Sequence, residues 1–110
     1  MGTKSSLLAD LPQARLLRLL SCSRRLDLLL LLNRHESDVS ELADAVGMSV
    51  SQASSYLREL RKEGYVQRRT VGVRRLHSTT DRVTIERIDE STFFKLAIPD
   101  GRALIIGYPD

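Results

Sequence analysis

Leucine recurs at helical spacing in two stretches near the start of the chain. The first, Leu7–Leu20, is expected to be a helix with Pro12 in its first turn, because an interior proline lacks an amide and clashes with the preceding turn. The second expected helix, Arg24–Asn33, follows Ser23, a residue type that caps helices. Leucine occupies nearly every side of this helix, so we expect it to be buried all round and to form the core.

Two further predicted helices follow and are separated by a short turn. The first is Glu41–Val46, with Ser40 as its N-cap and Gly47 at its end, where left-handed backbone is tolerated. The second begins after Ser49 and runs to about Glu63, before a second glycine. The pattern therefore predicts a helix-turn-helix.

The second of these helices has two distinct faces. Ser49 and Gln52 have the spacing of a capping box, in which each side chain bonds the other residue's amide. The buried face is expected to contain Ala53, Leu57 and Leu60, which are spaced i, i+4 and i+7. The opposite face carries small polar and basic residues: Ser51, Gln52, Ser54, Ser55, Arg58 and Lys62.

After Gly64 the pattern changes to that of strands. Tyr65–Thr70 and Val73–Thr79 are rich in β-branched residues and are joined at Val71–Gly72, which predicts a hairpin. The hairpin carries four arginines: Arg68, Arg69, Arg74 and Arg75.

Three more strands are expected in the last part of the chain. About thirty residues cannot bury a core alone, so their sheet must lie on the helical part or on another subunit. Its apolar runs are expected to pack there, in preference to lining a ligand pocket. The expected strands are Val83–Ile88, Phe93–Ile98 and Ala103–Tyr108.

Composition and charge narrow the choice of function. The 110 residues are 42% hydrophobic and 28% charged, which is typical of one globular domain. The net charge is only +3, but residues 58–80 hold seven basic and two acidic groups. Such a basic block fits a phosphate-bearing partner, with an ordinary solvated surface as the alternative.

Several classes of function find little support in the sequence. The longest apolar run, Leu28–Leu32, is far shorter than the ~18–20 residues of a membrane span. His35 and His77 have no second ligand at metal spacing, so they are expected to be exposed or beside phosphates. No nucleophile–base pair or phosphate-binding glycine loop is present. We therefore expect no catalytic residues, no metal, no cofactor and no membrane association.

The single cysteine, Cys22, leaves two interpretations open. It precedes Arg24 and Arg25, whose charges could make it redox-active, but a lone cysteine is more often a small buried hydrophobe. One cysteine excludes a disulfide within the chain and fits a reducing compartment. We expect a cytoplasmic protein associated with the nucleoid.

The order of elements predicts a winged helix-turn-helix. The class is mainly α with a β wing (α+β), followed by a small antiparallel β element. The major groove of DNA is ~12 Å wide and admits one helix with short polar side chains, as residues 50–63 provide. Wing arginines within residues 65–79 would reach phosphates or a minor groove. We divide the chain into a flexible tail (1–6), the winged domain (7–80) and a C-terminal β extension for packing or dimerisation (81–110).

The motifs resemble ArsR-type transcriptional regulators over roughly residues 14–80. The resemblance rests on three segments, Ser23–Leu29, Val39–Ser49 and Ser54–Val66, of which "LRELRKEGYV" is the most specific. MarR-type and other winged-helix regulators have similar runs. The resemblance implies a homodimer on palindromic double-stranded DNA, with bases and backbone contacted by Ser51, Gln52, Ser54, Ser55 and Tyr56 and phosphate by Arg58.

Two departures from that family are visible. Metal-sensing members carry Cys-x-Cys where this chain has Asp38-Val39-Ser40, which offers no thiolate for a soft ion. The long C-terminal helix that joins subunits in the family is replaced here by strands.

The sequence therefore predicts a sequence-specific DNA-binding regulator, most simply a dimeric repressor, and names no small-molecule effector. The alternative is a winged-helix module that binds a protein partner. The full set of expected DNA-binding residues is Ser49, Ser51, Gln52, Ser54, Ser55, Tyr56, Arg58, Lys62, Arg68, Arg69, Arg74 and Arg75.

Overall fold

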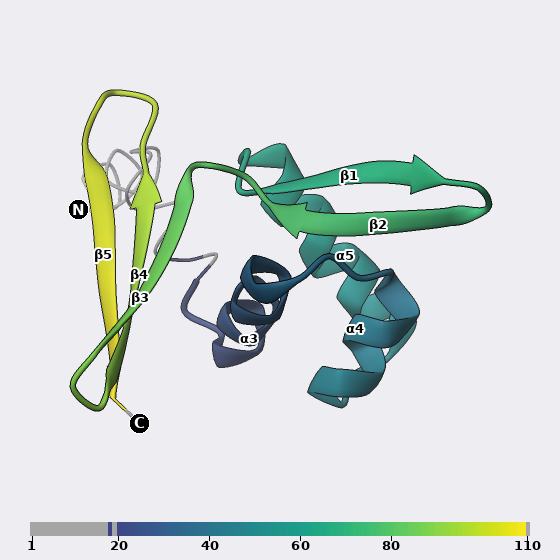
Figure 1. Ribbon diagram of the computed structural model, residues 1–110, viewed down its shortest axis with the longest axis horizontal. Helices are drawn as coiled ribbons and strands as arrows, with labels where there is room; N and C mark the ends of the chain where they lie inside the picture. Colours follow the sequence, from purple (N-terminus) through teal and green to yellow (C-terminus); the bar gives the residue numbers. More distant parts are fainter. Residues whose placement is uncertain (1–17, 19, 110) are drawn as a thin grey trace, which may run out of the picture.

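The computed structural model describes Arg18 and residues 20–109, so the tail and nearly all of the expected helix Leu7–Leu20 lie outside the described residues. Within that part, no helix has the length and apolar character needed to cross a membrane. Figure 1 shows helices followed by two separate β elements. In chain order these are α3 (Ser23–Arg34), α4 (Val39–Val46), α5 (Val50–Lys62), β1 (Val66–Val71), β2 (Arg74–Thr79), β3 (Val83–Ile88), β4 (Ser91–Ala97) and β5 (Ala103–Pro109).

Two of the predicted helix caps are wrong. Helix α3 already includes Ser23, and the residue before it, Cys22, makes no side-chain cap. Helix α4 is capped by Asp38, whose Oδ1 accepts from the Glu41 amide at 2.9 Å, while Glu41 Oε1 accepts from the Asp38 amide at 3.2 Å. Ser40 has no acidic residue three positions later, so the Asp38–Glu41 pair satisfies two helix amides where Ser40 could satisfy one.

The turn between α4 and α5 follows the sequence prediction more closely. Gly47 ends α4 in the left-handed conformation, with φ of 76°. Ser49 Oγ accepts from the Gln52 amide at 3.0 Å, which confirms the cap of α5. The second half of that capping box does not form, because the side chain of Gln52 turns to Tyr56 instead. Gln52 Nε2 donates to the Tyr56 hydroxyl at 3.1 Å.

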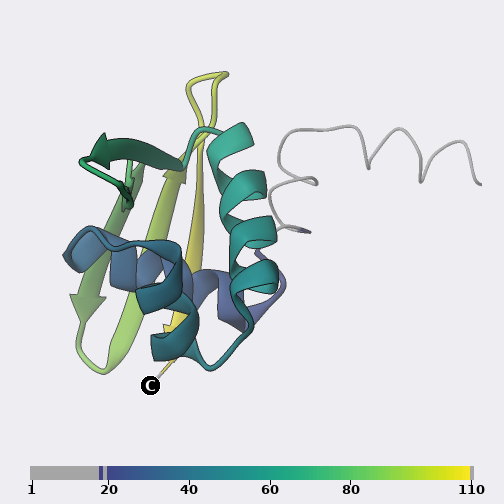
Figure 2. The ribbon, with the colours of Figure 1, turned by 90° about the vertical axis from the view of Figure 1, so that its right-hand side faces the viewer.

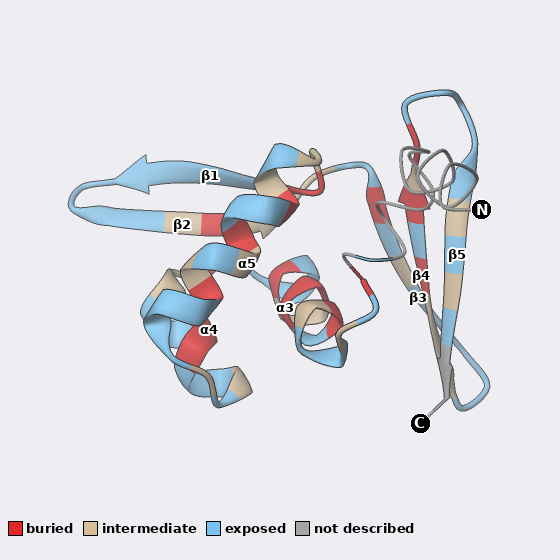
Figure 3. Cartoon of the chain, turned by 180° about the vertical axis from the view of Figure 1, so that it is seen from behind, coloured by how far each residue is buried: buried red, intermediate tan, exposed pale blue. Residues whose placement is uncertain are grey.

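The leucines of α3 form the centre of the core. They are not buried all round, because Leu30 and Leu31 are half-buried and Asp27 is exposed. Helix α5 and strand β4 contribute to the same core, and Figure 3 shows buried residues in α3, α5 and β4. The fully buried leucines of this core are Leu28, Leu29, Leu32, Leu42, Leu57, Leu60 and Leu96.

Strands β1 and β2 form the wing. They pair antiparallel from Val66–Thr79 to Val71–Arg74, so the turn falls at Gly72–Val73, one residue later than predicted. The positive φ of Gly72, 62°, provides the left-handed backbone that the first turn position needs. The wing extends well beyond the helices in Figure 1.

Strands β3, β4 and β5 form a second antiparallel sheet in that order. The inner face places Val83, Phe94 and Leu96 in the core shared with the helices, and the Tyr65 hydroxyl donates to the Ala97 carbonyl at 2.8 Å. The sequence left open whether this sheet lies on the helices or on another subunit, and the structure shows it on the helices. Figures 1 and 3 place α3 between the sheet and the helix-turn-helix.

This shared core predicts that the sheet and the helices unfold together. Leu96→Ala should lower the free energy of unfolding by about 2–5 kcal/mol, because it removes a fully buried side chain. Val73→Ala, at the fully exposed tip of the wing, should change it by about 0.5 kcal/mol or less. Urea denaturation followed by circular dichroism measures both. Two separate transitions, or equal effects of the two variants, would contradict the shared core.

Candidate nucleic-acid interface

The polar face of α5 is open to solvent. Ser49, at the helix start, is exposed, and Ser54 is half-buried on the side facing the wing. The C-terminal sheet lies beyond α3 and leaves this face uncovered, as Figures 1 and 2 show from two directions. The exposed residues of the face are those expected from the sequence: Ser51, Gln52, Ser55, Arg58 and Lys62.

Tyr56 differs from its neighbours because it is anchored. It is half-buried, and the Arg25 guanidinium lies 4.4 Å from its ring centroid. Arg25 also lies 3.4 Å from a Glu59 carboxylate oxygen. Because the Tyr56 hydroxyl accepts one N–H of Gln52, it fixes the direction of that side chain and leaves the Gln52 carbonyl oxygen and a second N–H available.

Cys22 lies beside the same group of residues. Burial raises the pKa of its thiol. Hydrogen bonds from the Arg24 and Arg25 backbone amides and from the Tyr56 hydroxyl lower it, and so does the charge of Arg25, so that the pKa lies below its ordinary value. The thiol is only partly buried. This environment follows from the start of α3 and from packing against α5.

Two wing arginines are paired with carboxylates. Arg69 binds Glu36 through two nitrogens, with Nε 2.8 Å from Oε2. Arg74 binds Asp38, with Nη2 2.9 Å from Oδ2, and also Glu41. The Arg69 hydrogen bond lowers the pKa of Glu36, and the Glu41 amide followed by Arg74 lowers the pKa of Asp38. These pairs tie the wing to the loop before α4.

The other two wing arginines, Arg68 and Arg75, lie on the opposite face of the hairpin. Side chains alternate along a strand, and Arg68 pairs across the wing with His77, so Arg68, Arg75 and His77 share one face. They line a cleft of about 450 Å³ between the wing and α5. The remaining walls include Ser54, Arg58 and Arg61 of α5 and Asp38.

Arg61 was missing from the set predicted from the sequence. It lies seven residues after Ser54 and three after Arg58, so the helical spacing of these residues was the signal that could have found it. Burial lowers the pKa of Arg61, and the charges of Arg68, Arg58 and Arg75 lower it further. Three further arginine charges therefore act on Arg61.

His77 is buried at 4% exposure, which corrects the expectation of an exposed histidine; His35 is exposed as expected. Arg61 Nη1 lies 3.3 Å from His77 Nε2, and since a guanidinium can only donate, Nε2 accepts and Nδ1 carries the proton. Nδ1 has no partner among the described residues. Burial lowers the pKa of His77, with Arg61 and Arg68 adding to the effect.

Comparison with known proteins agrees with this geometry. The family model for bacterial regulatory proteins of the arsR family matches residues 22–68. The chain is 36% identical to the homodimeric winged helix-turn-helix domain of Mb0332 from Mycobacterium bovis, a possible ArsR-family transcriptional regulator, over 69% of this chain and 68% of that one, with a TM-score of 0.58. The chain belongs to the ArsR family.

Other solved structures give the same result. A predicted DNA-binding transcriptional regulator from E. coli is 30% identical over 63% of this chain and 74% of its own, with a TM-score of 0.56. The regulator HlyU from Vibrio vulnificus is 27% identical over 74% of this chain and 84% of its own, with a TM-score of 0.57. No curated protein matches the chain. The resemblance and the winged α+β fold predicted from the sequence are confirmed, and the protein is a DNA-binding transcriptional regulator of this family.

The buried state of His77 predicts a pH effect on stability. Its pKa in the folded protein lies below 6.5, so the unfolded chain binds the proton more readily. The free energy of unfolding should therefore be fully retained above pH 6.5 and fall below it, by at most about 1.4 kcal/mol per pH unit, until the folded pKa is reached. Urea denaturation between pH 7.5 and about 5 measures this slope.

Two variants test whether His77 causes this pH dependence of the free energy of unfolding. His77→Gln should flatten it, because the buried titrating group is gone. His35→Gln, which removes the exposed histidine, should leave it unchanged. An unaltered slope in His77→Gln would contradict the assignment.

Proposed function

We propose that this regulator is a dimeric repressor that inserts α5 into the major groove of its operator. The observation that carries the proposal is the uncovered polar face of α5 beside an arginine-lined cleft. A helix with short polar side chains fits the groove, and its neighbouring positive charges attract the phosphates on either side. A repressor needs only to occupy its operator, for which a winged helix and a dimer contact are sufficient.

The exposed residues of α5 divide into two proposed roles. Ser51, Gln52 and Ser55 read base edges, since hydroxyl and amide groups can both donate and accept. Gln52 is the strongest candidate because Tyr56 already holds its side chain in place, which makes Tyr56 a positioning residue. Arg58 and Lys62 bind phosphates on the flanking strand.

The remaining proposed contacts come from the start of α5 and from the wing. Ser49 places the free amides of the helix N-terminus toward a phosphate, and Ser54 lies on the cleft side of the helix. Arg68 and Arg75 bind phosphates directly. Arg69 and Arg74 contribute only if DNA competes with the carboxylates that now hold them.

Residues 81–110 supply the proposed dimer contact. The Mb0332 domain is homodimeric. In this chain the outer face of the C-terminal sheet exposes Ile88 and Ile105 beside a half-buried Phe93, an apolar patch that a monomer would leave in water. Glu86 and Lys95 lie on the same face and supply opposite charges that a second copy can match.

The central experiment is selection of bound duplexes from random DNA, followed by titration of the winning sequence at two salt concentrations. The proposal requires a palindromic site and a steep loss of affinity with salt, with a log–log slope of ~0.9 per neutralised phosphate. If no duplex is enriched and affinity does not depend on salt, the proposal is wrong and the result favours the alternative of a protein-binding module.

Base reading and phosphate binding are separable by substitution. Gln52→Ala should reduce discrimination between operator and a single-base variant by roughly 1–3 kcal/mol, because a bidentate base contact is lost. Arg75→Gln should weaken binding to every duplex and lower the salt slope by about 0.9. Arg102→Gln removes the same charge beside the C-terminal sheet, and it should change neither the discrimination between duplexes nor the salt slope. Fluorescence anisotropy with both duplexes measures the three variants, and a uniform loss in Gln52→Ala would argue against base reading.

The dimer contact is tested on the sheet itself. Ile105→Asp places a charge in the proposed interface and should shift the protein from dimer to monomer in sedimentation velocity, at concentrations where the parent protein is dimeric. Val73→Asp, at the fully exposed tip of the wing, is the matched control and should remain dimeric. A dimeric Ile105→Asp variant would exclude this face as the interface.

A further inference from the structure

The cleft between the wing and α5 has an unusual balance of charge. Five arginines line it: Arg58, Arg61, Arg68, Arg74 and Arg75. Asp38 is the only acidic residue among the described residues that line the cleft, and its carboxylate is already bound by Arg74. Arg74 is also paired with Glu41, whereas the other four arginines make no ion pair with a carboxylate among the described residues. The nearby Glu36 is bound by Arg69.

Such an arrangement is unfavourable without an anion. Like charges that lie close together in a partly enclosed space repel more strongly than they would in open water. The repulsion is visible in Arg61, whose pKa is lowered by burial and then by Arg68, Arg58 and Arg75. The nearest polar partner of Arg61 is the neutral imidazole of His77, which leaves its charge uncompensated.

The floor of the cleft adds an unsatisfied polar group. His77 is more than nine-tenths buried, and its Nδ1–H has no acceptor among the described residues. A buried donor without an acceptor costs free energy. The buried Nδ1–H is therefore a second uncompensated polar group beside Arg61, which lies against the Nε2 side of the same ring.

We propose that this cleft is a binding site for a phosphate group. Guanidinium groups bind phosphate oxygens in pairs, and several arginines around one phosphate are a common arrangement. The volume of about 450 Å³ lies within the roughly 300–1,000 Å³ of ligand pockets, so the site has room for more than the phosphate alone. Arg61 is the residue at its centre, because its charge is coupled to those of Arg58, Arg68 and Arg75.

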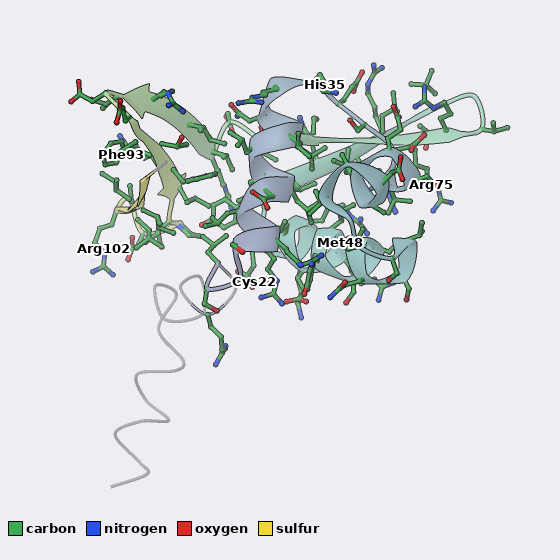
Figure 4. The ribbon with its side chains drawn as sticks, turned by 90° about the horizontal axis from the view of Figure 1, so that it is seen from below. Cys22, His35, Met48, Arg75, Phe93 and Arg102 are labelled. Atoms are coloured by element: carbon green, nitrogen blue, oxygen red, sulfur yellow. The ribbon has the colours of Figure 1, made fainter. Side chains whose placement is uncertain are left out.

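Two sources can supply the same chemistry. One is the DNA backbone beside α5, in which case the site extends the proposed function and rests on it. The other is a small phosphorylated molecule, whose binding would occupy the wing side of the interface. The cleft lies at the end of the molecule that carries Arg75, while Arg102 lies on the C-terminal sheet at the other end (Figure 4).

The test titrates the full chain with inorganic phosphate and with pyrophosphate by isothermal calorimetry, at ionic strength held constant with sodium chloride. Saturable binding is expected. Arg61→Gln and Arg68→Gln should each weaken it about ten-fold, because each removes a charge-assisted contact. Arg102→Gln, with the same loss of charge outside the cleft, should bind as the parent protein does. Absence of saturable binding, or equal weakening by all three variants, would overturn the proposal.

Arg68→Gln keeps the test valid if Arg61→Gln fails to fold, because Arg68 is exposed on the wing. The source is then identified by measuring duplex affinity of the variant that has lost phosphate binding. A parallel loss assigns the site to the DNA backbone, and an unchanged duplex affinity assigns it to a free phosphorylated molecule. Phosphate binding without any duplex binding would reject the proposed function alone, while duplex binding without phosphate binding would reject this site alone.

Discussion

The packing of the α3 leucines is the interaction on which the rest of the structure depends. Leu28, Leu29 and Leu32 are buried in the core that α3 shares with α5 and the C-terminal sheet. Because α5 contributes Leu57 and Leu60 to the same core, its apolar face is committed inward and its polar face must point outward. The candidate DNA-binding surface is thus the complement of the core, and it is fixed by the same residues that stabilise the fold.

The wing is positioned by polar contacts instead. Its strand β2 exchanges two backbone hydrogen bonds between His77 and Ser37, of 2.8 and 3.0 Å, which join the hairpin to the loop after α3. Arg69 and Arg74 then bind carboxylates of that loop and of α4. These contacts separate the four wing arginines into one pair that holds the wing in place and another pair, Arg68 and Arg75, that remains on the face toward α5.

The sequence predicts the parts of this structure that depend on local signals. Ser49 caps α5 and Gly47 ends α4 as expected, because a cap or a left-handed residue acts within a few positions of the chain. Helical spacing could have placed Arg61 on the same side of α5 as Ser54 and Arg58, but no local signal indicates its contact with His77, which lies sixteen positions away. The pairs Arg69–Glu36 and Arg74–Asp38 span 33 and 36 positions, so the charge pattern alone could not separate these arginines from Arg68 and Arg75.

Asp38 shows how one side chain can connect the two halves of the candidate interface. Its Oδ1 caps α4, the first helix of the helix-turn-helix, and its Oδ2 binds Arg74 of the wing. The carboxylate is held ionised by both contacts, as its lowered pKa indicates. Asp38 thus acts together with the Ser37–His77 backbone hydrogen bonds and the Arg69–Glu36 pair in joining the wing to the start of the helix-turn-helix.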